Sequence, residues 1–234
     1  MTRCLNALSR DPLSAPELSI VRDRLTKAGA VIRQTSELVK DFTNHFTKVL
    51  VVQKHPTEDT FSSGTTGQYI GRSVVTNMQR SDLNVAEVAD SIVHEAIHAL
   101  LSMQERRRKW VLEEDLYDST PRAISPWSGR HLPLRAFLQA CFVWYGLLNF
   151  WLQAYTRGIE IERSSESGRQ IQDRIAAAAT GFLKGSLFDH ISEFTDRISP
   201  DILNAIEEMQ QRLIDAFSRS IGGKLSQARA VIKT

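Results

Sequence analysis

The stretch from residue 84 to residue 103 constrains this chain more than any other, because its pattern predicts one amphipathic helix. Asn84 is a suitable N-cap, and Glu87 follows three residues later, as a capping box requires. Apolar residues recur through the stretch at helical spacing and predict a buried face. They are Val85, Ala89, Ile92, Val93, Ala96, Ile97, Leu100 and Leu101.

This helix contains the sequence His-Glu-Ala-Ile-His at residues 94–98. Residues four apart lie on one face of a helix, so His94 and His98 can bind one metal ion. Glu95 projects about 100° around the axis from His94, which suits an acid–base role better than ligation. Because the flanks are apolar, two imidazoles and a carboxylate here call for a partner. The sequence predicts a metal centre; the alternative is three side chains that face water.

Composition favours a single metal-binding domain over residues 1–234, with 42% hydrophobic residues to form a core. We expect the metal-site core at 45–155 and a C-terminal helical part at 160–234. The net charge of +2 identifies no charged partner. The two cysteines form no metal-binding pair and the N-terminal residues do not resemble a signal peptide, so a cytoplasmic location is expected.

The remaining pattern predicts a mainly α protein with a small β-sheet, an α+β class. A strand, a loop and a second strand precede the metal-binding helix, as in a zincin-like site, where an edge strand beside the helix holds an extended peptide. The Ser/Thr/Gly-rich loop either lines that cleft or is an ordinary hairpin connection. We expect helices at 15–43 (with a break near Gly29), 136–155, 168–195 and 199–218, strands at 46–52 and 68–78, and the loop at 56–67.

The segment 136–155 is apolar nearly all round and long enough to span a membrane. Arg135 immediately before it, and the helical character of the chain, favour instead a central buried helix around which the site is arranged. Gln139 within this helix needs a polar partner, which a metal site or a ligand would supply. The charge run at 105–109 predicts a solvated face, and without interleaved aromatic residues it gives no clear indication of nucleic-acid binding.

A third metal ligand is not fixed by the motif. His131 lies in the loop that leads into the central helix, and Glu113 follows the motif helix, although an acidic turn in water is the simpler interpretation of Glu113. Arg130 and Arg135 are suited to binding a carboxylate through two parallel hydrogen bonds.

Two stretches together resemble a bacterial family, the αKG-HExxH-type peptide β-hydroxylases. The first is residues 93–101, and the second runs from Pro126-Trp127 through Pro133-Leu134 to Phe150-Trp151. The resemblance covers roughly residues 60–155. It implies a mononuclear iron(II) site that uses 2-oxoglutarate and O2 to hydroxylate a side chain of a ribosomally made peptide, with His94 and His98 as iron ligands. Where many members carry a further histidine this chain has Gln139 or Trp144, so the third ligand stays open between His131 and a carboxylate.

Three functions follow as hypotheses. The first is the iron and 2-oxoglutarate hydroxylase, a chemistry suited to a site with few protein ligands, with Arg135 or else Arg130 holding the far carboxylate of 2-oxoglutarate. The second is a zinc peptidase in which Glu95 is the general base. The third is a non-catalytic relative that binds a peptide or another partner.

Overall fold

The computed structural model describes residues 12–55, 60–65, 69–112, 123–161 and 167–221. Its contacts form two compact units, Met1–Ser102 with Thr156–Ser167, and Met103–Tyr155 with Gly168–Thr234. We call them the first and the second unit. The sequence analysis expected a boundary between residues 155 and 160, whereas the first boundary between the two units lies between Ser102 and Met103. The expectation of a single metal-binding domain stays a prediction.

The first unit begins with two helices, α2 (Ala15–Thr35) and α3 (Glu37–Phe46). Ser14 caps α2 in a capping box with Glu17. The predicted break near Gly29 is wrong, because Gly29 lies inside α2 and the chain turns at Ser36. Ser36 is extended, donates its N–H to the Ile32 carbonyl, and accepts a hydrogen bond from the Val39 N–H as the N-cap of α3.

Three short strands follow, β1 (Val49–Gln53), β2 (Ser62–Thr65) and β3 (Arg72–Thr76). The order is β1-β3-β2, with β1 parallel and β2 antiparallel to β3. The two predicted strands are present in shortened form, but the prediction of a loop throughout 56–67 is wrong, because Ser62–Thr65 pairs with β3 as an edge strand. Residues 56–59 and 66–68 lie outside the described part.

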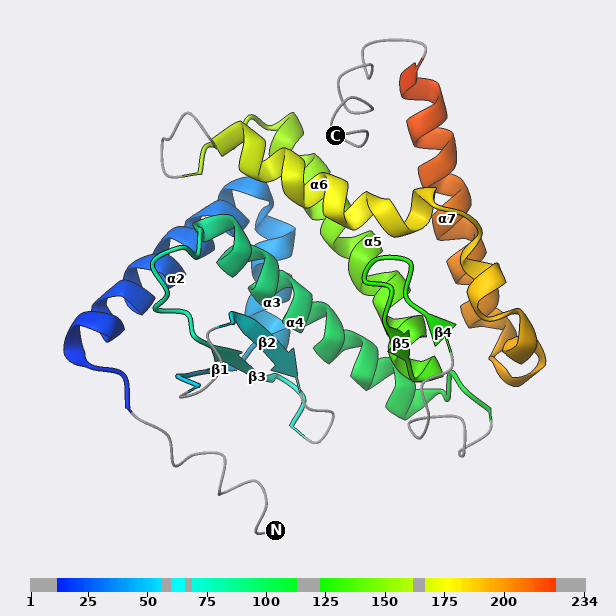
Figure 1. Ribbon diagram of the computed structural model, residues 1–234, viewed down its shortest axis with the longest axis horizontal. Helices are drawn as coiled ribbons and strands as arrows, with labels where there is room; N and C mark the ends of the chain where they lie inside the picture. Colours follow the sequence, from blue (N-terminus) through cyan, green and yellow to red (C-terminus); the bar gives the residue numbers. More distant parts are fainter. Residues whose placement is uncertain (1–11, 56–59, 66–68, 113–122, 162–166, 222–234) are drawn as a thin grey trace. The chain divides into compact units, whose positions relative to one another are not determined.

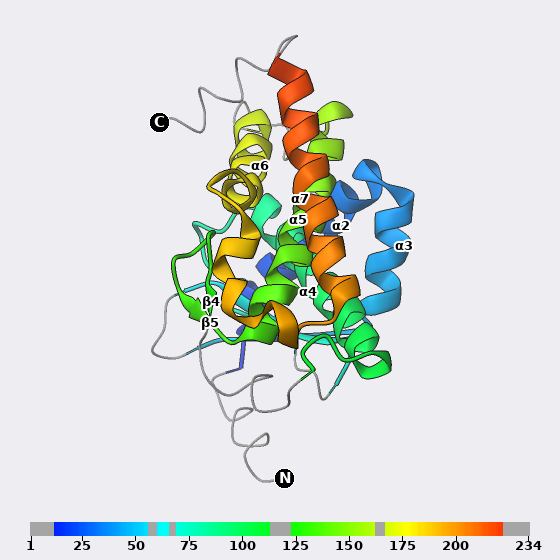
Figure 2. The same ribbon diagram turned by 90° about the vertical axis from the view of Figure 1, so that its right-hand side faces the viewer.

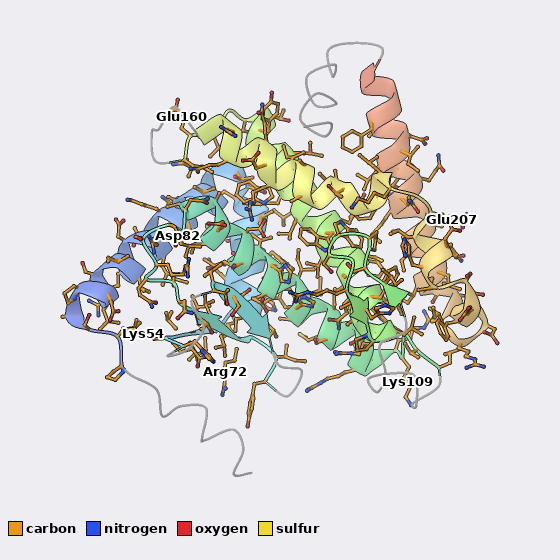
Figure 3. The ribbon with its side chains drawn as sticks, in the orientation of Figure 1. Lys54, Arg72, Asp82, Lys109, Glu160 and Glu207 are labelled. Atoms are coloured by element: carbon orange, nitrogen blue, oxygen red, sulfur yellow. The ribbon has the colours of Figure 1, made fainter. Side chains whose placement is uncertain are left out.

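A lysine ties the sheet to the first helix. Lys54, immediately after β1, donates to Glu17 of α2 at 2.7 Å; this contact first, and the hydrogen bonds from Ser14 second, lower the pKa of Glu17 to about 2. Figure 3 shows Lys54 and Arg72 at the sheet and Asp82 in the connection to the next helix. Asn77, directly after β3, has a positive φ of 62°, and its side chain accepts a hydrogen bond from the His55 N–H. This contact fixes the turn between β3 and the next helix.

The predicted motif helix is α4 (Val85–Arg107). Its capping box is confirmed, since Asn84 Oδ1 accepts from the Glu87 N–H at 2.9 Å and Glu87 accepts from the Asn84 N–H at 3.1 Å. The helix runs four residues beyond its predicted end at Met103. Its N-terminal part, through Ser102, belongs to the first unit, where the sheet lies against it (Figure 1).

The second unit contains a two-stranded ribbon, β4 (Ala123–Ile124) and β5 (His131–Leu132), followed by α5 (Leu134–Thr156). Helix α5 is the predicted apolar helix, and about half of its side chains are fully buried. None of the helices in the described ranges is both long and apolar enough to cross a membrane.

The predicted helix at 168–195 is wrong in its second half. Helix α6 (Ser167–Leu183) stops there, and two 3-10 helices follow, η3 (Leu187–His190) and η4 (Ser192–Arg197). The buried side chain of Gln210 accepts from the Leu187 N–H and donates to the carbonyls of Phe182 and Gly185, so it satisfies the backbone groups that this break exposes.

Gln210 comes from the last helix, α7 (Pro200–Ile221), which runs beside η3 (Figure 1, Figure 2). Its start at Ser199-Pro200 is confirmed, and Ser199 accepts from the N–H of Ile202 and Leu203. The pair Gly222-Gly223, which predicts the end of this helix, lies outside the described residues. The protein is thus mostly helical with a small mixed sheet, as the α+β prediction states.

Trp127, in the loop between the two strands of the ribbon, packs against α6 within the second unit. Its indole N–H donates to the Ala178 carbonyl at 2.9 Å, and its ring lies edge-on to Phe182. The backbone of α6 comes so close at Gly181 that a Cβ built there would overlap the indole ring. The Pro126-Trp127 pair of the resemblance therefore has a packing role.

We predict that Gly181→Ala lowers the free energy of unfolding by about 1–3 kcal/mol, because the indole must move out of its site. Gly168→Ala is the matched control, since Gly168 lies in the same helix with open space around its Cβ position. Urea unfolding followed by tryptophan fluorescence measures both. Equal effects of the two substitutions would contradict the packing role of Trp127.

Candidate metal centre

Helix α4 places the two motif histidines side by side. Nε2 of His98 lies 3.1 Å from Nε2 of His94, and the ring centroids are 4.8 Å apart. Metal–nitrogen bonds to histidine are about 2.0–2.1 Å long. A single ion can therefore contact both nitrogens, because 3.1 Å is less than twice that length.

The electrostatics of the pair favour metal binding over protonation. Burial first, and the neighbouring His98 second, lower the pKa of His94 to about 3. Near neutral pH this imidazole is therefore uncharged, and neutral imidazole is the form that binds a metal. The donor set thus fits a transition metal by its chemistry as well as its spacing.

Glu95 is 1% exposed, far less than a carboxylate in a solvated face would be. Its Oε1 accepts a hydrogen bond of 2.6 Å from the Ser63 hydroxyl. Its Oε2 is buried and accepts no hydrogen bond from the residues that the structure describes. A buried carboxylate oxygen costs free energy unless a donor meets it, so Oε2 is suited to a ligand that carries a proton.

Ser63 is the site residue that the sequence analysis missed. It lies on β2 opposite Val75 of β3, and Thr65 lies opposite Ser73, with hydroxyl oxygens 3.2 Å apart. Thr65 also donates to the backbone carbonyl of Glu95 at 3.5 Å. The alternation of Ser63 and Thr65 in a Ser/Thr/Gly segment is a period-two signal, but it is too short to be distinguished from a loop.

Among the residues that the structure describes, no third protein ligand is found. Over the described ranges, no three His, Cys, Asp or Glu side chains lie close enough together to hold a metal ion. His131 lies on β5 in the second unit with its side chain exposed, and its backbone pairs with Ile124. Glu113 lies outside the described residues. The ligand role of His131 stays a prediction, and the structure supplies two imidazole donors.

The charge run at 105–109 is not wholly a solvated face, because Glu105 is buried at 6% exposure. Its Oε2 accepts from Arg135 Nε and from Gln139 Nε2, each at 2.8 Å. The partner that Gln139 requires is therefore this carboxylate within the second unit. Arg135 is already paired, so a cofactor carboxylate would have to share its guanidinium with Glu105.

The other residues singled out by the resemblance have simpler surroundings. Trp144, at one of the positions where relatives of that family carry histidine, stacks on Trp127 with centroids 5.9 Å apart and planes 14° apart. The side chain of Arg130 is exposed. Its role in holding 2-oxoglutarate stays a prediction, as does that of Arg135.

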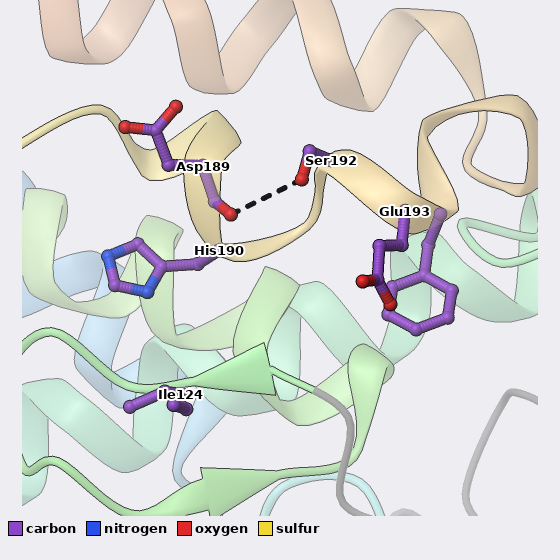
Figure 4. Close-up of a pocket in the computed structure, with 6 residues that line it drawn as sticks. Ile124, Asp189, His190, Ser192 and Glu193 are labelled. Carbon is purple, nitrogen blue, oxygen red and sulfur yellow. Dashed lines mark hydrogen bonds between the residues drawn. The ribbon is translucent and has the colours of Figure 1, made fainter.

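A separate hollow lies in the second unit between β4 and the 3-10 segment (Figure 4). It has a volume of about 210 Å³ and is lined by Ile124, Asp189, His190, Ser192, Glu193 and Phe194. The His190 ring also packs near Phe137 of α5. The predicted metal ligands His94, His98 and His131 are not among the residues that line this hollow.

No protein-family model matches the chain, and no curated protein matches it. The resemblance to the peptide hydroxylases therefore rests on the motifs quoted above.

We predict that the metal-free protein loses stability as the pH falls below about 6.5. The unfolded chain binds a proton at His94 near the ordinary pKa of 6.5, while the folded protein resists it down to about 3. Stability therefore rises with pH across this window, by at most about 1.4 kcal/mol per pH unit. Urea unfolding of His94→Asn should show a shallower pH dependence than wild type.

His45→Asn is the control for this measurement, because His45 is exposed at the end of α3. A pH dependence of His94→Asn as steep as that of wild type would contradict the assignment.

We predict that Gln139→Leu lowers the free energy of unfolding by about 1–3 kcal/mol, because Glu105 loses a donor in a buried environment. Gln153→Leu, on the same helix but partly exposed, should change it much less. Thermal unfolding of the two variants checks this. A Gln139→Leu protein as stable as wild type would show that Glu105 does not depend on this amide.

Proposed function

We propose that the protein is a metal-dependent enzyme whose ion is held by His94 and His98, with Glu95 as the acid–base residue beside them. The observation that carries the proposal is the 3.1 Å approach of the two Nε2 atoms on a helix that also buries the carboxylate of Glu95. Oε2 of that carboxylate accepts no hydrogen bond from the described residues, which suits it to a group that carries a proton.

The favoured activity is hydroxylation of a peptide side chain with iron(II), 2-oxoglutarate and O2, as in natural-product biosynthesis. A site with few protein ligands suits this chemistry, because the cofactor and O2 must both reach the metal. The bound iron would activate O2 at the expense of 2-oxoglutarate. The residues of this chain would bind the metal through His94 and His98 and hold or move a proton at Glu95 Oε2.

The sheet supports a peptide as the substrate. Strand β2 is an outer strand in the order β1-β3-β2 and lies against α4 at Glu95. The outer edge of such a strand can bind an extended chain through its backbone. A zincin-like arrangement of edge strand and motif helix is part of the proposal.

A zinc peptidase is the second candidate, favoured by Glu95 itself. A buried carboxylate with one oxygen available is suited to a general base that takes a proton from water. The two candidates share the same metal-binding residues, so the metal and the reaction must be tested together.

We predict that His94→Ala and His98→Ala each abolish metal binding while the protein stays folded. Wild type and variants are loaded with iron(II) under anaerobic conditions, or with zinc, and their metal content is measured after gel filtration. His45→Ala is the control and should keep full occupancy. Full metal content in either motif variant would place the site elsewhere, and no uptake by wild type would favour a non-catalytic binding protein.

The loaded wild type then separates the two activities. Release of succinate from 2-oxoglutarate by the iron form supports the oxygenase, and cleavage of casein by the zinc form supports the peptidase. An iron form that releases no succinate beside an active zinc form would overturn the favoured assignment.

A further inference from the structure

We infer that Ser63 is a positioning residue of the centre: its hydroxyl holds Glu95 Oε1, so that Oε2 is the oxygen that exchanges a proton with the reacting group. This inference rests on the proposed function, because Glu95 has a chemical role only beside a metal-binding pair. Ser63 is remote from the motif in sequence, and the fold alone brings it there.

The contact is short and enclosed. Ser63 Oγ lies 2.6 Å from Oε1, in the range of a hydrogen bond to a charged carboxylate. Glu95 is 1% exposed, so water does not compete freely for this bond. The two carboxylate oxygens are thereby made different: one accepts from the protein, and the other is buried without a donor among the described residues.

Strand β2 holds residue 95 at two points. Ser63 binds its carboxylate and Thr65 binds its backbone carbonyl, at 2.6 Å and 3.5 Å. Both hydroxyls lie on the face of the strand that is turned to α4, while Ser62 and Gly64 alternate with them and are exposed. The carboxylate therefore cannot rotate about its terminal bond without losing the Ser63 hydrogen bond. Orientation of the acid–base residue is a function of the edge strand.

The chemistry of serine is suited to this task. A hydroxyl donates one hydrogen and carries no charge, so it orients the carboxylate without neutralising it as a lysine or arginine would. Threonine would keep the donor, and alanine would remove it at nearly constant volume. The substitutions at residue 63 therefore separate the hydrogen bond from the packing of the strand.

The test compares wild type, Ser63→Ala, Ser63→Thr and Ser62→Ala, each loaded with cobalt(II). Cobalt content and the visible absorption bands of the bound ion are measured, together with whichever turnover wild type shows, succinate release by the iron form or casein cleavage by the zinc form. Ser62→Ala is the matched control, because it changes an exposed neighbour on the same strand.

We expect Ser63→Ala to bind cobalt with wild-type stoichiometry, because both imidazoles remain. Its visible bands should shift, and its turnover should fall by about 10–100-fold, the usual effect of losing a residue that orients a metal-site group. Ser63→Thr should recover the wild-type bands and most of the turnover, and Ser62→Ala should match wild type throughout. In a Glu95→Gln background, Ser63→Ala should cause no further loss, since both changes act on one group.

Several outcomes overturn the inference. The first is a Ser63→Ala protein whose cobalt bands and turnover match wild type. The second is a loss of turnover in Ser63→Ala that Ser63→Thr does not recover. The third is a Ser63→Ala substitution that lowers turnover as much in the Glu95→Gln background as in wild type. If wild type binds no cobalt, the proposed function falls and the role of Ser63 falls with it. If wild type binds cobalt and Ser63→Ala is indistinguishable from it, only the role of Ser63 is lost. When wild type shows neither turnover, the cobalt bands alone decide.

Discussion

Two buried carboxylates on one helix set the main constraint on this protein. Burying a charged carboxylate without partners costs several kcal/mol, so each must be met by donors from another element. Glu95 of α4 is met by Ser63 of β2 in the first unit, and Glu105 of the same helix by Arg135 and Gln139 of α5 in the second. Within the first unit the Ser63 contact holds the helix to the sheet, and within the second unit the corresponding contacts hold Glu105 to the apolar helix.

The two carboxylates differ in the donors that meet them. Arg135 and Gln139 both donate to one oxygen of Glu105, and the guanidinium compensates its charge. Glu95 accepts from a neutral hydroxyl, which leaves its charge uncompensated by that contact. A buried carboxylate paired with a guanidinium is suited to a structural role, whereas one that accepts from a neutral hydroxyl beside two imidazoles is a candidate for a reactive group. The imidazole pair next to Glu95, with His94 held neutral, is the environment in which we propose that this carboxylate is used.

Local signals in the sequence predicted local structure well. The capping residues Asn84 and Glu87, and the Ser199-Pro200 start of α7, satisfy backbone groups within a few residues, so their patterns are sufficient by themselves. Predictions failed where a distant contact overrides the local pattern. The helix expected over 168–195 breaks because Gln210, from another helix, stabilises the broken turn. The loop prediction for 56–67 fails at Ser62–Thr65, because pairing with β3, and not β propensity, makes this segment a strand.

The spacing within residues 94–98 was enough to predict the imidazole pair, because a helix places residues four apart on one face whatever surrounds it. The sequence also predicted that Gln139 must have a polar partner, since a buried amide requires one. Which groups meet became visible only in the folded protein. The partner of Gln139 is Glu105 and not a ligand, and the partner of Glu95 is Ser63. These contacts join residues more than thirty positions apart, and no periodicity within either segment encodes which distant hydroxyl or carboxylate will face it.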